Sequence, residues 1–404
     1  MYGNDINLLN LINYCSDSGW SGFDPYDALN SQLFNATPLR HSRICRIAFM
    51  QLLKRLPVNF RTLLQIEKRQ NPKAIALTLM AFIKLWNHGV LDDDAPVRLM
   101  IHNLVKLRSV NTPYWCWGYS FPWQTRSIMV PKGEPNLVCT VFAANALLDA
   151  YEAMGDEQCL AMAISASKYL LDLLYWTEGE TVGGFCYPLP GLRSRVHNAH
   201  FLGAALLCRT YGHTGETQLL EAALKVVRYS AAKQNEDGSW DYGESSKQGW
   251  VDNFHTGYNL SALHSIGAHA KTAEFEGHLR RGFSFYRKHF FREDGAPKYY
   301  HNRTYPIDIH SVAQSIITLV ELQELEEGTL DLACSVYGWA VNNMLDDKGF
   351  FYYQVHSLYT NKISYMRWSQ SWMLLALSTL SGMVESRGIV NDGHSCRNQP
   401  EAAR

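Results

Sequence analysis

The sequence of 404 residues lacks the marks of several large protein classes. Its nine cysteines are scattered and include no Cys-x-x-Cys pair, which argues against a disulfide framework or a zinc-finger array. Reduced thiols in a cytoplasmic protein are the simpler expectation. No apolar run reaches about 18 residues, and no basic region precedes an apolar stretch at the start. We therefore expect neither a membrane span nor a signal peptide.

An excess of charge of either sign is also missing. Lys and Arg number 37 against 38 Asp and Glu, so no bulk field attracts nucleic acid or an anionic membrane. Hydrophobic residues make up 47% and charged residues 19%, a balance that argues against disorder. Aromatic residues are plentiful, with 11 Trp and 22 Tyr, and such rings suit the walls of polar clefts.

An internal repeat organises the chain. Five stretches share one order: a loop rich in Gly and aromatic residues, a polar cluster, and a long apolar helix. These helices are predicted to start near Asn136, His197, Asp252, Asp308 and Met366, which are 61, 55, 56 and 58 residues apart. Amphipathic segments lie between them, with apolar residues at helical spacing. The pattern predicts buried inner helices alternating with outer helices that have one solvated face.

A weaker sixth unit covers residues 71–89 and the helix expected after Asp92. Six such hairpins close into an all-α (α/α)6 toroid, whereas an open solenoid is the alternative. The varied aromatic loops favour closure around a funnel, with short irregular or β-hairpin loops at its mouth, including residues 114–121 and 349–354. We expect one domain over 1–404, with helices of unassigned register in 1–70 and a frayed polar tail from about 385.

In a toroid, the loops and the first turns of the inner helices meet at one mouth. Aromatic rings there would stack on sugars, while Arg, Asn and Asp would bond hydroxyls and carboxylates, so the sequence predicts a glycan or sugar-precursor site. The side chains expected at this mouth are Trp115, Trp117, Tyr119, Trp123, Arg126, Arg195, His197, Asn198, His200, Asp252, Asn253, His255, Tyr258, Asp308, His310, Arg367 and Trp368.

Each of these residues also has a purely structural interpretation. Asp252 and Asp308 begin helices and would serve as N-caps. A lone histidine is more often structural than catalytic, although histidines recur at aligned places in three of the units. The tryptophans of residues 115–123 would fill the funnel floor, and the arginines would be solvated or paired with Asp252 and Asp308.

Two chemistries remain open at such a mouth. Inverting hydrolysis needs two carboxyl groups about 6.5–9.5 Å apart, for which Asp252 and Asp308 are the best pair and Glu134 and Glu244 are loop alternatives. The toroid alone does not choose between hydrolases, lyases and epimerases.

Lyase or epimerase chemistry needs a base that removes the proton next to the carboxylate of a uronate, and cations or amides that hold this carboxylate as negative charge builds. His255, His197 or Tyr258 would be the base. The groups that would hold the anion are Arg126, Arg195, Arg367 and Asn198. Because the expected mouth has more Arg, His and Tyr than acids, we lean towards an anionic sugar.

Two further readings differ in class. Asp252, His255 and His310 are ordinary zinc ligands, but a third strong ligand is not identified, so no cofactor is expected and zinc is kept as a minor alternative. A toroid that binds glycans without catalysis would show the same aromatic mouth, but a change at Asp252 would leave its role intact.

Two short motifs resemble known toroids. QNEDGSW, at residues 234–240, resembles the Gln-Trp repeat of terpene cyclases, and DNFHTGYNLSAL, at 252–263, is similar to the zinc-ligand helix of protein prenyltransferase β subunits. That zinc site also takes an earlier Asp-x-Cys, for which the nearest analogue here is the later Asp308-x-His310. The resemblance implies the α/α toroid and leaves an isoprenoid-handling enzyme as the second functional hypothesis.

A broader resemblance covers most of the chain from about Asn111. The segments WCWGYSFPWQTR, VFAANALLDAYE, VHNAHFLGAALL, DNFHTGYNL, DIHSVAQS and MRWSQSWM resemble the VpsJ-like family of exopolysaccharide loci. Its members are encoded among glycosyltransferases and polysaccharide-modifying enzymes. The resemblance implies a carbohydrate-active protein of bacterial surface-polysaccharide production.

Overall fold

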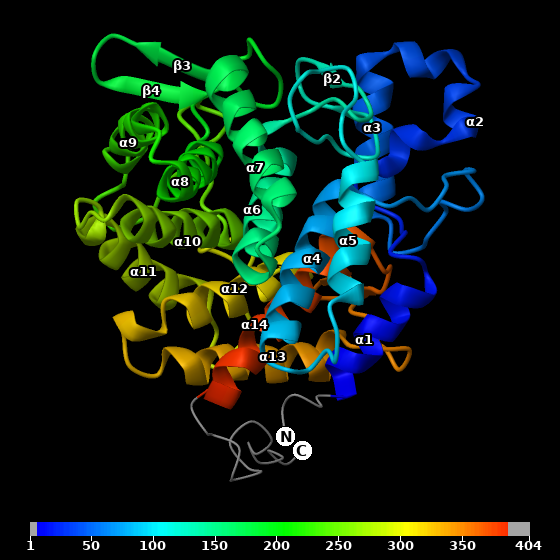
Figure 1. Cartoon of the computed structure of the whole chain (residues 1–404). Helices are drawn as coiled ribbons and strands as arrows, with labels where there is room; N and C mark the ends of the chain where they lie inside the picture. Colours follow the sequence, from blue (N-terminus) through cyan, green and yellow to red (C-terminus); the bar gives the residue numbers. More distant parts are fainter. Residues whose placement is uncertain (1–5, 387–404) are drawn as a thin grey trace.

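Helices that are apolar on nearly every face form the inner wall of the molecule, as the repeat predicts. In residues 6–386, which the computed structural model describes, six of them succeed one another: α4 (Pro72–Asn87), α6 (Leu137–Met154), α8 (His197–Thr214), α10 (Asn253–Ala270), α12 (Ile309–Glu321) and α14 (Ser371–Ser386). Each packs against the next, and α14 returns to α4, so that the red end of the chain lies beside the blue one (Figure 1). The fold is a closed (α/α)6 toroid, which confirms the predicted fold class.

Amphipathic helices cover the inner ring from outside. Each follows its inner partner along the chain and packs on it: α5 (Ala95–Lys106), α7 (Glu157–Tyr169), α9 (Thr217–Ala231), α11 (Glu276–Phe290) and α13 (Thr329–Met344). The outer place beside α14 is filled by α1 (Ile6–Asp17), from the opposite end of the chain. This helix belongs to the segment whose register the sequence left unassigned.

The segment between α1 and α4 lies over the junction of the first and last inner helices. Its short helices are η1 (Asp27–Asn30), α2 (Gln32–Asn35), η2 (Pro38–His41) and α3 (Arg43–Arg55). Phe23 forms a parallel bridge with Tyr365, directly before the π-helical turn η5 (Met366–Gln370) that leads into α14. Most of the predicted frayed tail, 385–404, lies outside the described residues.

Polar caps fix where the inner helices begin. The side chains of Asn71, Asn136, Asp252 and Asp308 each accept a backbone N–H of the first turn. The N-cap interpretation of the two aspartates is thereby confirmed. Gly257 lets α10 approach α12, because a Cβ there would lie 2.6 Å from Cγ of Gln314.

Short strands and helical turns lie in the connecting loops. They are β1 (Trp123–Gln124) with β2 (Met129–Val130), β3 (Tyr175–Glu178) with β4 (Val182–Phe185), and β5 (Ile307–Asp308) with β6 (Gln354–Val355) and β7 (Thr360–Asn361); η3 (Leu170–Leu174) and η4 (Gln323–Leu325) are helical turns. All pairings are antiparallel. Of the two loop segments expected to be irregular or hairpin pieces, 114–121 is irregular, while in 349–354 Phe351 forms an antiparallel bridge with Leu345 and Gln354 begins β6.

Within residues 6–386, α6 is the one helix whose length and composition would allow it to cross a membrane. It is an inner helix and 67% buried, and core helices of this kind meet the same criterion. The cysteines in the described part of the chain are all free thiols.

Candidate functional site

A cavity of about 300 Å³ lies where the first turns of the inner helices meet. Each of the six inner helices places the second residue after its N-cap in this wall. For the last inner helix the N-cap is Tyr365, which precedes η5. These residues are Lys73, Val138, Asn198, Phe254, His310 and Arg367. We call this hollow the central cavity.

Aromatic side chains from the loops complete the wall. They are Tyr26, Tyr119, Phe121, Trp123, Tyr187, Tyr242, Trp250, Tyr299, Tyr300 and Trp368. Three buried polar atoms of wall residues, Oδ1 of Asn198, Nε1 of Trp123 and Nδ1 of His310, have no hydrogen-bond partner among the described residues. Aromatic faces with unused hydrogen-bonding groups suit a ligand that has both apolar faces and hydroxyls.

The start of α10 places a carboxylate and an imidazole together at the cavity. Asp252 is buried, and its Oδ2 lies 2.7 Å from Nδ1 of His255, while Oδ1 accepts the backbone N–H of the same residue. Trp250 Nε1 donates to Oδ2 at 3.1 Å. The His255 ring stays 22% exposed at the wall. Because Nδ1 is bound to the carboxylate, Nε2 is left to act on a ligand, the arrangement of an oriented general base.

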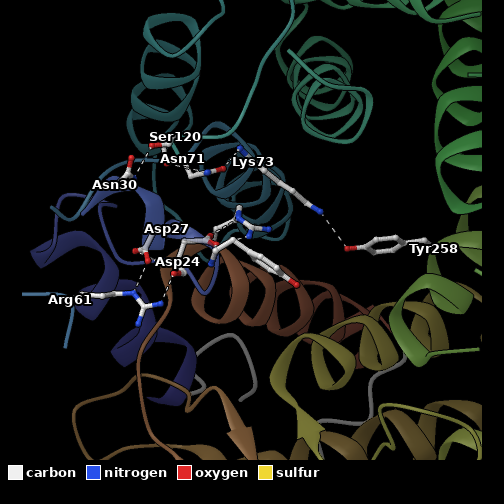
Figure 2. Close-up of polar contacts among 10 residues, drawn as sticks. Asp24, Asp27, Asn30, Arg61, Asn71, Lys73, Ser120 and Tyr258 are labelled. Atoms are coloured by element: carbon white, nitrogen blue, oxygen red, sulfur yellow. Dashed lines mark hydrogen bonds and ion pairs between the residues drawn. The ribbon is translucent and has the colours of Figure 1, made fainter. Parts of the chain in front are cut away.

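A second polar chain crosses the cavity floor. The Tyr258 hydroxyl and Nε2 of His310 are 2.6 Å apart, and Lys73 Nζ donates to the same hydroxyl at 3.4 Å. Figure 2 shows the Lys73 side chain extending from the start of α4 towards Tyr258. The Lys73 ammonium position also lies over the rings of Phe142 and Trp372. Tyr258 therefore holds its proton between two nitrogen groups.

Burial sets the charge of this chain. Desolvation lowers the pKa of Lys73 well below its ordinary value, with Arg367 nearby adding to the effect. Burial likewise lowers the pKa of His310 and raises the pKa of Tyr258, so the imidazole is neutral and the phenol protonated at pH 7. Tyr258 can therefore donate a hydrogen bond to a ligand and can serve as a general acid.

Arg367 lines the cavity, but its charge is already paired. Its Nε and Nη2 donate to Asp24 at 2.6 and 2.8 Å, and both side chains are buried. The Asp24 backbone N–H donates to Asp27, the first residue of η1, and Asp27 pairs with the buried Arg61 (Figure 2). The loop before η1 therefore fixes the guanidinium in the wall and neutralises it.

Asp308 does not line the central cavity. Its oxygens accept hydrogen bonds from Trp368 Nε1 at 2.9 Å and from Gln354 Nε2 at 2.6 Å. Burial raises the pKa of Asp308 to about 6, against partial compensation by these donors. Asp308 supports Trp368 behind the wall, and the structure does not bring it to face Asp252 across the cavity.

His197 and His200 also lie behind the wall. Nδ1 of His200 is 3.0 Å and Nδ1 of His197 is 3.4 Å from Ser230 Oγ on α9. Burial lowers the pKa of His197 to about 4 and the pKa of His200 to about 3. Both rings are neutral packing groups between an inner and an outer helix.

Five more of the expected residues are away from the cavity. Trp117 is fully buried and donates to Leu104, Trp115 packs beside it against Arg108, and Asn253 bonds Tyr286 in the core. Arg126 is exposed between β1 and β2, and Arg195 pairs with Glu178 and Glu244 at the surface. The residues that do line it are Tyr119, Trp123, Asn198, Asp252, His255, Tyr258, His310, Arg367 and Trp368.

Sequence reasoning missed Lys73, Asp24 and Tyr26. Lys73 follows the cap Asn71 by two positions, as His310 follows Asp308, so alignment of the weak sixth unit on its cap would have found it. Asp24 and Tyr26 lie in the segment outside the repeat, where no periodic signal exists.

A zinc site with Asp252, His255 and His310 finds no further support in geometry. The part of the chain that is described contains no group of three or more His, Cys, Asp or Glu placed to hold a metal ion. His310 Nε2 faces the Tyr258 hydroxyl, and Asp252 is taken up by its neighbours on α10.

Known proteins resemble this chain in fold. No protein-family model and no curated protein sequence matches it. Solved structures do match, with TM-scores of 0.59 for cellobiose 2-epimerase from Spirochaeta thermophila, 0.57 for a GH76 α-mannanase from Bacteroides thetaiotaomicron and 0.58 for a D-mannose isomerase. Identities are 15%, 15% and 10%; the matches cover 79%, 80% and 78% of this chain and 87% of each of the others.

The chain has the (α/α)6 toroid of sugar epimerases and glycosidases. At these identities the likeness concerns the fold, so the choice of chemistry falls to the residues of the central cavity.

Proposed function

We propose that this protein is a carbohydrate-active enzyme that moves a proton at a carbon atom of a sugar, as an epimerase or isomerase does. The observation that carries the proposal is the central cavity wall. Among the described residues, its one carboxylate is Asp252, which orients His255, and a protonated phenol at Tyr258 lies on the same helix. The structural neighbours named as an epimerase and an isomerase support this choice.

The proposed step uses the open-chain carbonyl form of the sugar. Nε2 of His255 takes the proton from the carbon next to the carbonyl, and the C–H electron pair forms a carbon–carbon double bond. The carbonyl π electrons move to oxygen, which takes the proton of the Tyr258 hydroxyl, giving an enediol. Return of the His255 proton to the former carbonyl carbon, while the hydroxyl on the neighbouring carbon gives its proton to the Tyr258 phenolate, gives the ketose or aldose isomer. For the epimer, the original carbon takes a proton from solvent water on its other face, the enol proton returns to the Tyr258 phenolate, and His255 releases its proton to the solvent. We propose no cofactor for this step.

Two-carboxylate hydrolysis fits the wall less well. It needs a second carboxyl group facing Asp252. Asp308, the best partner from sequence, is occupied by Trp368 and Gln354 behind the wall, and Glu134 and Glu244 do not line the cavity.

Elimination at a uronate needs free positive charge to hold the substrate carboxylate. Arg367 is paired with Asp24, and desolvation favours the neutral amine of Lys73. The cavity therefore favours a neutral reacting sugar over the anionic one expected from composition.

The biological setting rests on the VpsJ-like resemblance. We propose that the protein acts in the cytoplasm on a precursor of a bacterial surface or exopolysaccharide. An isoprenoid substrate is disfavoured, because the wall offers unused polar atoms that a hydrocarbon would leave unpaired.

Deuterium exchange tests the reaction directly. The purified protein is incubated in D₂O with glucose, mannose, cellobiose and mannobiose, and loss of the proton next to the carbonyl is followed by NMR. We expect exchange in the wild type and none above background in His255→Ala. Release of new reducing ends from glycosides without exchange would instead establish a hydrolase.

The same variants separate catalysis from binding alone. If the wild type binds sugar by calorimetry but exchanges nothing, and Asp252→Asn binds equally well, the protein is a glycan-binding toroid and the proposal is wrong.

A further inference from the structure

A second hollow adjoins the central cavity. Its volume is about 530 Å³, and we call it the outer groove. It is lined by Gly249, Trp250, Val251, Tyr300, His301, Asn302 and Arg303. Trp250 and Tyr300 also line the central cavity, so the two hollows share a boundary. None of the groove-only residues takes part in the proposed proton transfer.

The boundary between the hollows is aromatic and held in place. The Trp250 ring stacks on Tyr242 with centroids 4.6 Å apart and an interplanar angle of 16°, and its indole N–H donates to Asp252. The Tyr300 ring contacts Tyr299 at 4.6 Å, and the Arg303 guanidinium lies 4.1 Å from its centroid. Half-buried rings fixed in this way give a sugar flat apolar faces at little entropic cost.

Backbone contacts fix the far side of the groove. Tyr300 forms an antiparallel bridge with Asp252, and a second one with Arg303. Nδ1 of His301 lies 3.3 Å from the Val251 carbonyl, and Lys298 Nζ donates to the His301 carbonyl at 3.0 Å. The groove is thus attached directly to the residue that orients His255, and it is formed before any ligand arrives.

Exposed polar groups line the opening. Asn302 and Arg303 are exposed, and within residues 6–383 no carboxylate forms an ion pair with Arg303. Amide and guanidinium donors beside aromatic faces match the hydroxyls and apolar faces of a sugar ring. The central cavity, at about 300 Å³, is at the small end of the range for ligand sites, roughly 300–1,000 Å³. A longer ligand would extend into the groove.

We propose that the outer groove is a second sugar-binding subsite, and that the substrate is an oligosaccharide whose reducing-end unit enters the central cavity. This rests on the proposed function, because only the reducing end of a glycan has an open-chain carbonyl form. The unit in the groove is the glycosidic neighbour of the reacting one, and Trp250 and Tyr300 lie at the junction between the two units.

The groove can be blocked without touching the cavity. Gly249 is exposed, has no positive φ, and a Cβ there would have its nearest neighbour at 3.9 Å. Gly249→Phe therefore adds a bulky ring to a residue of the groove wall without backbone strain, and Gly249→Ala is the matched control. Arg303→Gln removes the guanidinium from the same hollow.

The experiment compares deuterium exchange on cellobiose and mannobiose with exchange on glucose and mannose. We expect the wild type to have at least about tenfold higher kcat/KM on a disaccharide than on its monosaccharide. Gly249→Phe should remove that advantage and leave monosaccharide exchange within about twofold. Arg303→Gln should lose part of it and Gly249→Ala none.

Two results would overturn the subsite. One is equal kcat/KM on both sugar sizes in the wild type, and the other is an unchanged disaccharide advantage in Gly249→Phe; in both, the proposed function stands. If the wild type exchanges no sugar, the proposed function fails, and calorimetric binding of the same sugars to the same variants decides the subsite alone.

Discussion

The first turns of α8 and α10 have similar sequences and different fates. HNAHFLGAAL begins α8 and DNFHTGYNL begins α10, and both carry a histidine within the first turn and a half. On α8, His197 and His200 are buried against Ser230. On α10, His255 is held by Asp252 at the cavity wall. Residue type alone therefore does not decide which histidine reaches a ligand.

Register decides it. The second residue after an inner-helix N-cap lines the cavity, as Asn198 and Phe254 do. His197 and His200 are first and fourth after their cap, three residues apart on the face that meets the outer helix. His255 is third after its cap, which keeps it at the edge of the cavity. The cap itself supplies the second difference, because the N-cap of α8 is Val196, which has no side-chain acceptor, whereas the N-cap of α10 is Asp252.

The largest effect is expected when His255 on α10 and His200 on α8 are each replaced by asparagine. His255→Asn should lower kcat by about 10²–10⁴, because it removes a general base, and leave the midpoint of thermal unfolding nearly unchanged. His200→Asn should keep kcat within about threefold and lower the unfolding midpoint instead. Exchange kinetics and calorimetric melting read out both; equal loss of kcat in the two variants would contradict the distinction.

Asp252→Asn examines the cap that separates the two helices. Asparagine also caps helices well, so the start of α10 should remain intact. The imidazole loses its charged partner, and we expect kcat to fall by about 10- to 100-fold with KM little changed. A larger loss accompanied by an earlier melting transition would show that the aspartate acts mainly on the fold.

Acid should lower the free energy of unfolding through His197 and His200, the two buried histidines of α8. The folded-state pKa values of His197 and His200, about 4 and 3, lie below the ordinary 6.5, so the unfolded chain binds these protons first. Their contribution to stability is therefore complete above pH 6.5 and is lost as the pH falls from 6.5 towards 4.

Urea unfolding at pH 7.5 and pH 5 measures this loss. His200→Phe should cost about 1–3 kcal/mol at pH 7.5, because Ser230 and the Ser194 carbonyl lose a partner, and it should flatten the decline towards pH 5. An unchanged decline in the variant would place the acid sensitivity elsewhere.

Arg195→Gln should have the smallest effect. Its ion pairs with Glu178 and Glu244 are at the surface, and such pairs contribute about 0–1 kcal/mol. Sugar exchange should be the same as in the wild type within error. A clear fall in kcat/KM would show that Arg195 contributes to the reaction although it lies at the surface, away from the central cavity.

The ring could be predicted from sequence because burial leaves a periodic signal. Apolar helices recurring at 55–61 residues located the inner wall, and the caps Asn136, Asp252 and Asp308 located the starts of three of these helices. The same signal found His255 and His310 in the first turns of their helices and Tyr258 in the second turn of α10.

Loop residues could not be placed in this way. Arg126 and Arg195 lie outside any helix, so no period fixes where they point, and the general expectation that loops meet at the mouth was the only reason to place them there. The pairing of Arg367 with Asp24 joins positions 343 residues apart, and no local pattern records it. Neutralisation of that arginine changed the expected charge of the reacting sugar.

The packing of α1 on α14 has a consequence for folding during synthesis. Among the described helices, α14 is the last of the inner ring to leave the ribosome and is covered by α1, and Asp24 has no Arg367 to pair with until synthesis has passed η5. A chain that stops before η5 and α14 therefore has no closed ring, and its central cavity lacks the side chains of Arg367 and Trp368.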